Sequence, residues 1–183
     1  MQETTKAHIL MMGFKQMMAF LEDVKTKNNH PNGTYVAAKL TKASQSALDY
    51  FVTEAGITNA ADPKQYHSTV IYSRKGVPDV KNYKFKLPFK AHIKEWKLFD
   101  TQFGKSGKCL VAIMDSPELE KAHRDIRQQY GALHGFPDYH PHVTVSYDYD
   151  GPLPKVIPGV ALTYGSIEIK PLDPEFVPPK KDA

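Results

Sequence analysis

The chain of 183 residues repeats one order of secondary structure, and this repeat restricts its possible folds more than any other feature. Hydrophobic periodicity and turn residues predict strand, helix, strand and strand in the first half, and the same order in the second. In each copy the third segment is a strand that opens with histidine, any residue, then threonine. We therefore expect an α+β protein of two pseudo-symmetric lobes, with antiparallel strands, outer helices and a central cleft.

The boundaries of the elements follow from capping residues and from β-branched and aromatic runs. The first copy is predicted as strand 34–40, helix 42–54, strand 66–73 and strand 89–99, and the second as strand 108–115, helix 117–134, strand 142–147 and strand 162–172. Thr41 is expected to cap the first helix, and Ser116 and Pro117 to open the second. The chain is interpreted as one domain over 1–183, with a helix at 3–27, lobes at about 33–100 and 107–173, and a flexible tail at 174–183.

Composition indicates the cellular compartment of the protein and the charge of its ligands. A net charge of +4 and 41% hydrophobic residues are typical of a globular protein that attracts anions. The single cysteine, Cys109, cannot form an internal disulfide, which indicates a reducing interior. Neither a long apolar run nor a signal-peptide core is present, so we expect a cytoplasmic protein with no membrane partner.

The two repeated tetrapeptides suit the chemistry of a phosphodiester. They are His67-Ser68-Thr69-Val70 and His142-Val143-Thr144-Val145, 75 residues apart. Side chains at i and i+2 of a strand share one face, so each histidine points the same way as its threonine. One imidazole takes a proton from the attacking hydroxyl and the other protonates the departing oxygen, since histidine titrates near neutrality. The threonine hydroxyls donate to the non-bridging phosphate oxygens.

Nothing in these motifs requires a metal ion or a cofactor. Neither tetrapeptide contains a carboxylate or a cysteine. His140 and His142 flank Pro141 and could begin a metal site, but a recognisable third and fourth ligand is missing. We therefore expect no metal and no cofactor.

The paired motifs resemble those of the two-histidine (2H) phosphoesterase superfamily, which includes RNA cyclic phosphodiesterases and 2′,5′-oligonucleotide phosphodiesterases. The repeated pattern covers residues 34–172. The resemblance implies the bilobal 2H phosphoesterase fold and a hydrolase in which His67, Thr69, His142 and Thr144 are the catalytic residues.

Three further segments resemble the bacteriophage anti-CBASS branch of this superfamily. They are residues 33–37, residues 66–73 and residues 96–100. Enzymes of this branch degrade the cyclic di- and trinucleotides that bacteria make on infection. The resemblance implies that Tyr35 and Trp96 border the nucleotide, that Glu168 contacts it, and that the substrate is a cyclic oligonucleotide such as cyclic GMP-AMP or a cyclic trinucleotide. The protein would then act in the cytoplasm of a host bacterium.

Other readings of individual residues stay open at this point. Trp96 lies in an alternating strand pattern and suits a buried core as well as a base stack. Glu168 alternates with Ile167 and Ile169 and so faces away from the apolar side. Odd spacing from the histidines predicts that Tyr72 and Tyr147 lie on the opposite face. His123 and His134 are read as surface residues of the second helix.

The function favoured by these observations is metal-independent cleavage of 3′,5′ linkages in cyclic di- and trinucleotides. The ribose 2′-hydroxyl would attack phosphorus, forming a 2′,3′-cyclic phosphate that water opens to a 3′-phosphate. One alternative is an RNA 2′,3′-cyclic or 2′,5′ phosphodiesterase of RNA processing, although the modest charge argues against a long nucleic acid. The other is a non-enzymatic nucleotide-binding protein, against which two intact motifs count.

Overall fold

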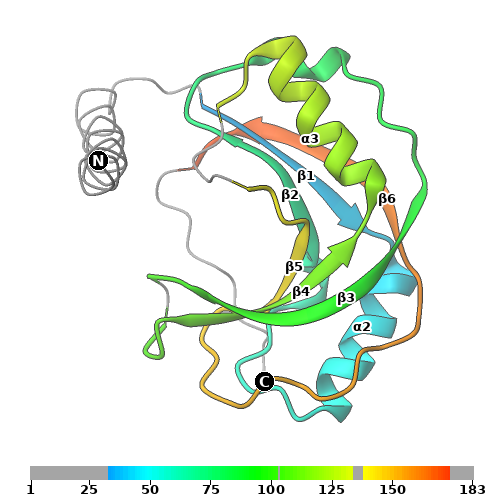
Figure 1. The fold of residues 1–183 in the computed structure, drawn as a ribbon, viewed down its shortest axis with the longest axis vertical. Coiled ribbons are helices and arrows are strands. Elements are labelled where there is room, and N and C mark those ends of the chain that lie inside the picture. The colour runs from blue at the N-terminus through cyan, green and yellow to red at the C-terminus, as the bar shows by residue number, and fades with distance from the viewer. Residues whose placement is uncertain (1–32, 103, 134–137, 174–183) are drawn as a thin grey trace, which may run out of the picture. The chain divides into compact units, whose positions relative to one another are not determined.

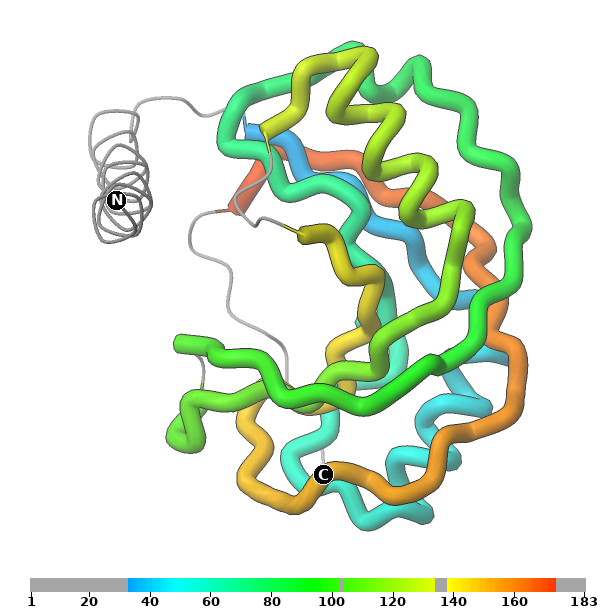
Figure 2. The backbone as a smooth tube through the Cα atoms, in the orientation of Figure 1, coloured from blue at the N-terminus to red at the C-terminus, as the bar shows by residue number. Residues whose placement is uncertain are grey.

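A computed structural model describes residues 33–102, 104–133 and 138–173 of the chain. Six strands form one antiparallel sheet in the order β2-β1-β6-β3-β4-β5 (Figures 1 and 2). The strands are β1 Thr34–Leu40, β2 His67–Ser73, β3 Phe89–Asp100, β4 Lys108–Asp115, β5 His142–Ser146 and β6 Leu162–Pro171. The expected α+β architecture is confirmed, whereas the predicted helix 3–27 and the tail 174–183 lie outside the described residues.

The strand order carries the duplication that the sequence predicts. In the repeat, β1 corresponds to β4, β2 to β5 and β3 to β6. When each strand is replaced by its counterpart, the sheet order is the same order read from the other end. The last strand of each copy pairs with the other copy: β6 lies against β1, and β3 lies against β4. The two lobes predicted at 33–100 and 107–173 therefore do not each form a separate group of paired strands. The paired groups are β2-β1-β6 and β3-β4-β5, which β3 and β6 join.

Two α-helices lie in the described residues, and each begins at the residue that the sequence predicts. Thr41 caps α2, Lys42–Glu54, by accepting from the backbone N–H of Ser44 at 3.3 Å. Ser116 caps α3, Pro117–Tyr130, in the same way. The second helix ends four residues earlier than predicted, because Gly131 takes a left-handed conformation with φ of 67° and closes it.

Both helices pack on one face of the sheet, which we call the core face. Apolar residues of α2 and α3 join those of the strands in a single buried cluster, which includes Leu48, Val52, Leu119, Ile126, Val36, Ala38, Leu110, Ala112, Val143 and Tyr164. Two short 3₁₀ helices, Pro63–Gln65 and Pro78–Asn82, complete the described connections. No helix among the described residues is long and apolar enough to cross a membrane.

Bulges interrupt the alternation of faces along four strands. The cross-strand partners show one extra residue at Val70 in β2, Lys94 in β3, Val145 in β5 and Gly165 in β6. Each extra residue moves every later side chain of that strand to the other face. A Cβ at Gly165 would lie 2.7 Å from Thr41 Cγ2, so a larger residue there would displace the side chain that caps α2. The bulges at Val70 and Val145 occupy equivalent places in the two histidine motifs.

Candidate active site

The two motif strands, one at each end of the strand order, lie next to each other. Ser68, buried between His67 and Thr69, donates its hydroxyl to the carbonyl oxygen of His142 at 2.8 Å. Ser68 Oγ is also hydrogen-bonded to Tyr164 Oη. This contact holds the two histidine motifs next to each other. Their histidines and threonines lie on the face opposite the core, which we call the histidine face, and are partly buried there.

Both histidines are held by the same backbone geometry. His67 Nδ1 is hydrogen-bonded to the carbonyl oxygen of Gln65 at 2.5 Å, and His142 Nδ1 to that of His140 at 2.7 Å. A carbonyl oxygen only accepts, so Nδ1 carries the proton in each ring. Proton exchange with a substrate therefore falls to Nε2 of each histidine. The duplicated motif thus places two imidazoles in the same tautomer, and each is held by the backbone carbonyl two residues before it in the chain.

The pKa of each histidine is lowered from its ordinary value. Burial disfavours the charged imidazolium at His67 and at His142. Lys39 and Lys170 lower the pKa of His67 further, against the opposite influence of the Gln65 carbonyl and Glu168. His67 in turn lowers the pKa of His142, which shows that the two rings interact electrostatically. Protonation of one ring therefore opposes protonation of the other, as an acid–base pair requires.

These shifts predict an acidic optimum for kcat/KM, which reports the free enzyme. One histidine must be neutral and the other protonated. Since both pKa values lie below 6.5, the protonated fraction of the acid falls about tenfold per unit of pH above that value. We expect kcat/KM to peak below about pH 6.5 and to fall on the alkaline side. Initial rates at low substrate between about pH 5 and pH 8 measure this; a maximum above about pH 7.5 would contradict it.

A tyrosine lies beside each motif threonine. Tyr35 Oη lies 3.3 Å from Thr69 Oγ1, and Tyr35 is paired across strands with Tyr72. The side chain of Tyr147 lies close to that of Thr144. Burial raises the pKa of both Tyr35 and Tyr147, so both phenols stay protonated at neutral pH.

The predicted placement of Tyr72 and Tyr147 is wrong. Both lie on the histidine face, because the bulges at Val70 and Val145 reverse the alternation between each histidine and its tyrosine. The side chains of the two are nevertheless not equivalent. Tyr147 is partly buried against Thr144, whereas Tyr72 is 47% exposed.

A charged cluster borders His67 on the histidine face. Glu168 forms an ion pair with Lys39 through one carboxylate oxygen and with Lys170 through the other, both with N···O distances of 3.5 Å. Lys39 is the cross-strand neighbour of His67, and Lys170 lies 5.3 Å above the ring of Tyr35. Two ammonium groups thus share one carboxylate, which leaves a positive surplus beside the histidine. As the alternation with Ile167 and Ile169 predicts, Glu168 faces away from the core.

Trp96 does not join the other predicted site residues. It is only 5% exposed and stacks on Phe51 of α2, with ring centroids 5.5 Å apart, while its Nε1 donates to the carbonyl oxygen of Val156 at 2.9 Å. Its cross-strand partner is Ala112 on the core face. The bulge at Lys94 turns Trp96 inward, so the expected base stack on this residue is corrected to a core contact.

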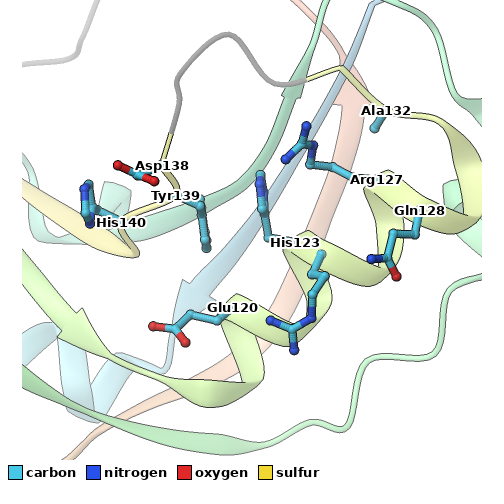
Figure 3. Close-up of a pocket in the computed structure, with 9 residues that line it drawn as sticks. Glu120, His123, Arg127, Gln128, Ala132, Asp138, Tyr139 and His140 are labelled. Carbon is cyan, nitrogen blue, oxygen red and sulfur yellow. The ribbon is translucent and has the colours of Figure 1, made fainter.

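His123 is likewise not a surface residue. It is 4% exposed, its Nδ1 donates to the carbonyl oxygen of Val70 at 2.7 Å, and its ring stacks on Tyr139 at 4.0 Å (Figure 3). Tyr139 in turn donates its hydroxyl to the carbonyl oxygen of Thr69 at 2.8 Å. Together they satisfy two carbonyls of β2 around its bulge. His134 lies outside the described residues.

A pocket of about 730 Å³ lies beside these two rings, outside the histidine face (Figure 3). It is lined by Glu120, His123, Arg124, Arg127, Gln128, Ala132, Asp138, Tyr139 and His140. Neither motif threonine nor motif histidine lines it. Within the described residues, no group of three or more histidine, cysteine, aspartate or glutamate side chains is placed to hold a metal ion, there or on the histidine face.

Sequence reasoning missed Tyr147, Lys39 and Lys170 as members of the site. A signal for Tyr147 was present, since a tyrosine follows the histidine by five residues in both motifs. The strict alternation rule assigned it to the wrong face. For Lys39 and Lys170 no signal existed, because only the pairing of β1 with β2 and β6 brings them to His67 and Glu168.

Comparison with known proteins agrees with this geometry. A model of the family described as anti-CBASS protein Acb1 matches residues 32–177. The protein of that name from Vibrio phage KVP40 is 40% identical over 118 residues, which are 63% of this chain and 73% of the relative. The one from Enterobacteria phage T4 is 37% identical over 122 residues, 66% of this chain and 75% of the relative.

Solved structures share the fold at low sequence identity. The protein TT0787 of Thermus thermophilus superposes with a TM-score of 0.55 and 14% identity, over 75% of this chain and 86% of that one. LigT of E. coli in its apo form superposes with a TM-score of 0.51 and 13% identity, over 79% and 96%. These neighbours confirm the predicted two-histidine phosphoesterase fold.

Proposed function

Because this chain belongs to the anti-CBASS protein Acb1 family, and is a phosphodiesterase of the two-histidine fold, we propose that it cleaves 3′,5′ linkages of cyclic di- and trinucleotides without a metal ion. Its role is to oppose CBASS signalling inside an infected bacterial host cell. The observation that carries the proposal is the pair of anchored, electrostatically coupled histidines, each beside a threonine hydroxyl.

The reaction begins with attack by an internal nucleophile. Nε2 of one histidine removes the proton of the ribose 2′-hydroxyl, and the oxygen attacks the adjacent phosphorus. Nε2 of the other histidine protonates the departing 5′-oxygen. The ring opens to a chain that ends in a 2′,3′-cyclic phosphate. Water then attacks that phosphate with the two proton-transfer roles reversed, and leaves a 3′-phosphate.

The threonines stabilise the charge that develops on the phosphate. A trigonal-bipyramidal phosphorane bears more negative charge on its non-bridging oxygens than the ground state does. Thr69 and Thr144 donate hydroxyl protons to those oxygens from the two neighbouring motif strands. Since neither motif holds a carboxylate, the two imidazoles supply the proton transfers and the two hydroxyls the charge stabilisation that a metal provides elsewhere.

The charged cluster favours a substrate with more than one phosphate. One phosphodiester occupies the motifs, and a cyclic di- or trinucleotide carries at least one more. Lys39 and Lys170 exceed the charge of Glu168 and attract that second anion. Tyr35 borders the nucleotide through its ring edge, and Glu168 accepts from a base or holds the lysines in place. A single-phosphate RNA end would gain less from this arrangement.

The test is a substrate panel run in EDTA. We expect cyclic di- and trinucleotides with 3′,5′ linkages to be opened at a rate that the chelator leaves unchanged, with linear products seen by mass spectrometry. Linear RNA and 2′,3′-cyclic mononucleotides serve as comparison substrates. Faster cleavage of these would favour RNA processing, binding without turnover would favour a nucleotide-binding protein, and activity lost in EDTA and restored by one divalent ion would refute the metal-free mechanism.

A further inference from the structure

The two motif strands meet without pairing as strands of the sheet. β2 and β5 are the end strands of the sheet order, and they lie next to each other (Figure 1). Each pairs with an inner strand, β1 or β4, and within the described residues no backbone hydrogen bond joins β2 to β5. Backbone pairing therefore does not set the spacing of these two strands beside the histidines, and side-chain contacts must set it.

Ser68 joins the two motifs directly. Its hydroxyl donates to the carbonyl oxygen of His142 at 2.8 Å, and Tyr164 Oη lies 2.5 Å from the same Ser68 Oγ. A carbonyl oxygen only accepts, so the single hydroxyl proton of Ser68 points to His142, and Tyr164 donates to Ser68. Ser68 and Tyr164 are both fully buried, so water does not compete for these bonds.

Tyr164 is itself held at the centre of the sheet. It is the cross-strand partner of Leu40 in β1 and of Phe89 in β3, and its ring stacks on that of Phe89 with centroids 5.1 Å apart. The hydrogen bonds from Tyr164 to Ser68 and from Ser68 to His142 thus connect the middle of the sheet to both of its end strands.

The second motif has no counterpart of this hydroxyl. Val143 occupies the equivalent position, is also fully buried, and offers only hydrocarbon. Each imidazole is fixed to its own strand, because His67 Nδ1 is bonded to the Gln65 carbonyl and His142 Nδ1 to the His140 carbonyl. A shift of one strand against the other would therefore change the distance between the two Nε2 atoms. The Ser68 hydroxyl opposes such a shift at the residue that bears the second imidazole.

We infer that Ser68 is a positioning residue of the reaction, whose hydroxyl, oriented by Tyr164, holds the His142 backbone and so sets the separation of the two imidazoles. The inference rests on the proposed function, because it requires both histidines to act on one phosphodiester. Ser68 lies on the core face and acts through His142, not through the substrate. Its contribution belongs to the chemical step, in which two proton transfers must be aligned with one phosphate.

The first test compares two buried serines of β2. We expect Ser68→Ala to lower kcat for a cyclic dinucleotide about 10- to 10²-fold, with KM changed less than about twofold, since a misplacement of about 1 Å can cost about 10²-fold. Ser73 is the matched control: it is fully buried, donates to the Lys75 carbonyl at 2.7 Å and accepts from the Leu133 N–H at 3.0 Å. Ser73→Ala removes a comparable pair of hydrogen bonds outside the motifs and should leave kcat unchanged.

A double-mutant cycle with Tyr164→Phe tests the orientation of the Ser68 hydroxyl. Tyr164→Phe removes one oxygen and leaves the Ser68 bond to His142 without its donor, so kcat should fall about 2- to 5-fold. In the Ser68→Ala background the same substitution should change kcat less than about twofold, because the hydroxyl that it orients is gone.

An activated substrate separates positioning from general damage to the fold. In a ribonucleoside 3′-(4-nitrophenyl phosphate) the leaving group departs without protonation, so the reaction needs the base but not the acid. The separation of the two imidazoles then matters little, and Ser68→Ala should lower the rate less than about threefold. A variant that is only less well folded would lose the same fraction of its activity with both substrates.

Equal losses from Ser68→Ala and Ser73→Ala would overturn the inference, as would independent effects of Ser68→Ala and Tyr164→Phe. Equal losses of Ser68→Ala on the cyclic dinucleotide and the nitrophenyl ester would also overturn it. Thermal unfolding of each variant ensures that folded proteins are compared. If the wild-type protein does not open cyclic dinucleotides, the proposed substrate fails while the inference remains testable, since a 2′,3′-cyclic mononucleotide needs the same pair of histidines.

Discussion

We expect His67→Ala and His142→Ala each to lower kcat for a cyclic dinucleotide by about 10²- to 10⁴-fold, the usual contribution of one acid–base group. Each substitution removes an imidazole whose Nδ1 is anchored to a carbonyl, and whose Nε2 exchanges a proton with the substrate in the proposed mechanism. The double variant should lose little more than the worse single variant, because base and acid act in one step. Single-turnover rates measure the chemical step directly.

Binding should survive in both variants, since the threonines, Tyr35 and the lysines stay in place. Equilibrium binding of an uncleaved nucleotide, compared with wild type, checks this. His92→Ala is the matched control, because His92 is an exposed histidine of β3 outside the motifs. Near wild-type kcat in either motif variant would refute the paired role, and an equal loss in His92→Ala would point to general destabilisation instead.

The largest effect is expected from the substrate rather than from the protein. A cyclic dinucleotide with a 2′-deoxy sugar at the cleaved linkage should bind and resist cleavage, with kcat lower by at least about 10⁵-fold. The internal 2′-hydroxyl is already next to the phosphorus, and such neighbouring nucleophiles have effective molarities of about 10⁵–10⁸ M. Neither histidine replaces this nucleophile in the proposed mechanism, because both histidines transfer protons there.

The products report the same step. With the ribo substrate, mass spectrometry at early times should show a linear nucleotide ending in a 2′,3′-cyclic phosphate, which later becomes a 3′-phosphate. A substrate with the deoxy sugar at the other linkage is the control and should be opened once, at its ribose. Rapid cleavage next to the deoxy sugar, or a product with a 5′-phosphate, would show that water attacks directly.

Much of the site could be predicted from the sequence because its information is local. A histidine and a threonine two positions apart on a strand share a face by backbone geometry alone, and both motifs obey this. Thr41 and Ser116 cap helices through contacts within three residues. The duplication also predicted that the motifs occupy equivalent strands, and the sheet order reflects it.

The faces of Trp96, Tyr72 and Tyr147 were decided by tertiary structure. Each lies beyond a bulge, at Lys94, Val70 or Val145, and one extra residue exchanges the two faces of a strand. A bulge forms where the pairing of neighbouring strands and the packing of the core require it. None of these three bulge positions is a glycine, a residue that could have indicated a bulge in the sequence.

Long-range pairing likewise decided the electrostatics of the site. Lys39, Glu168 and Lys170 come together because β1 pairs with both β2 and β6, which are separated by almost 90 residues of chain. The sequence by itself determined the two histidine–threonine pairs and the family, since these depend on spacing within one strand. Only the tertiary structure decided which tyrosines face the threonines and which cations border His67, because cross-strand register depends on how the whole sheet packs.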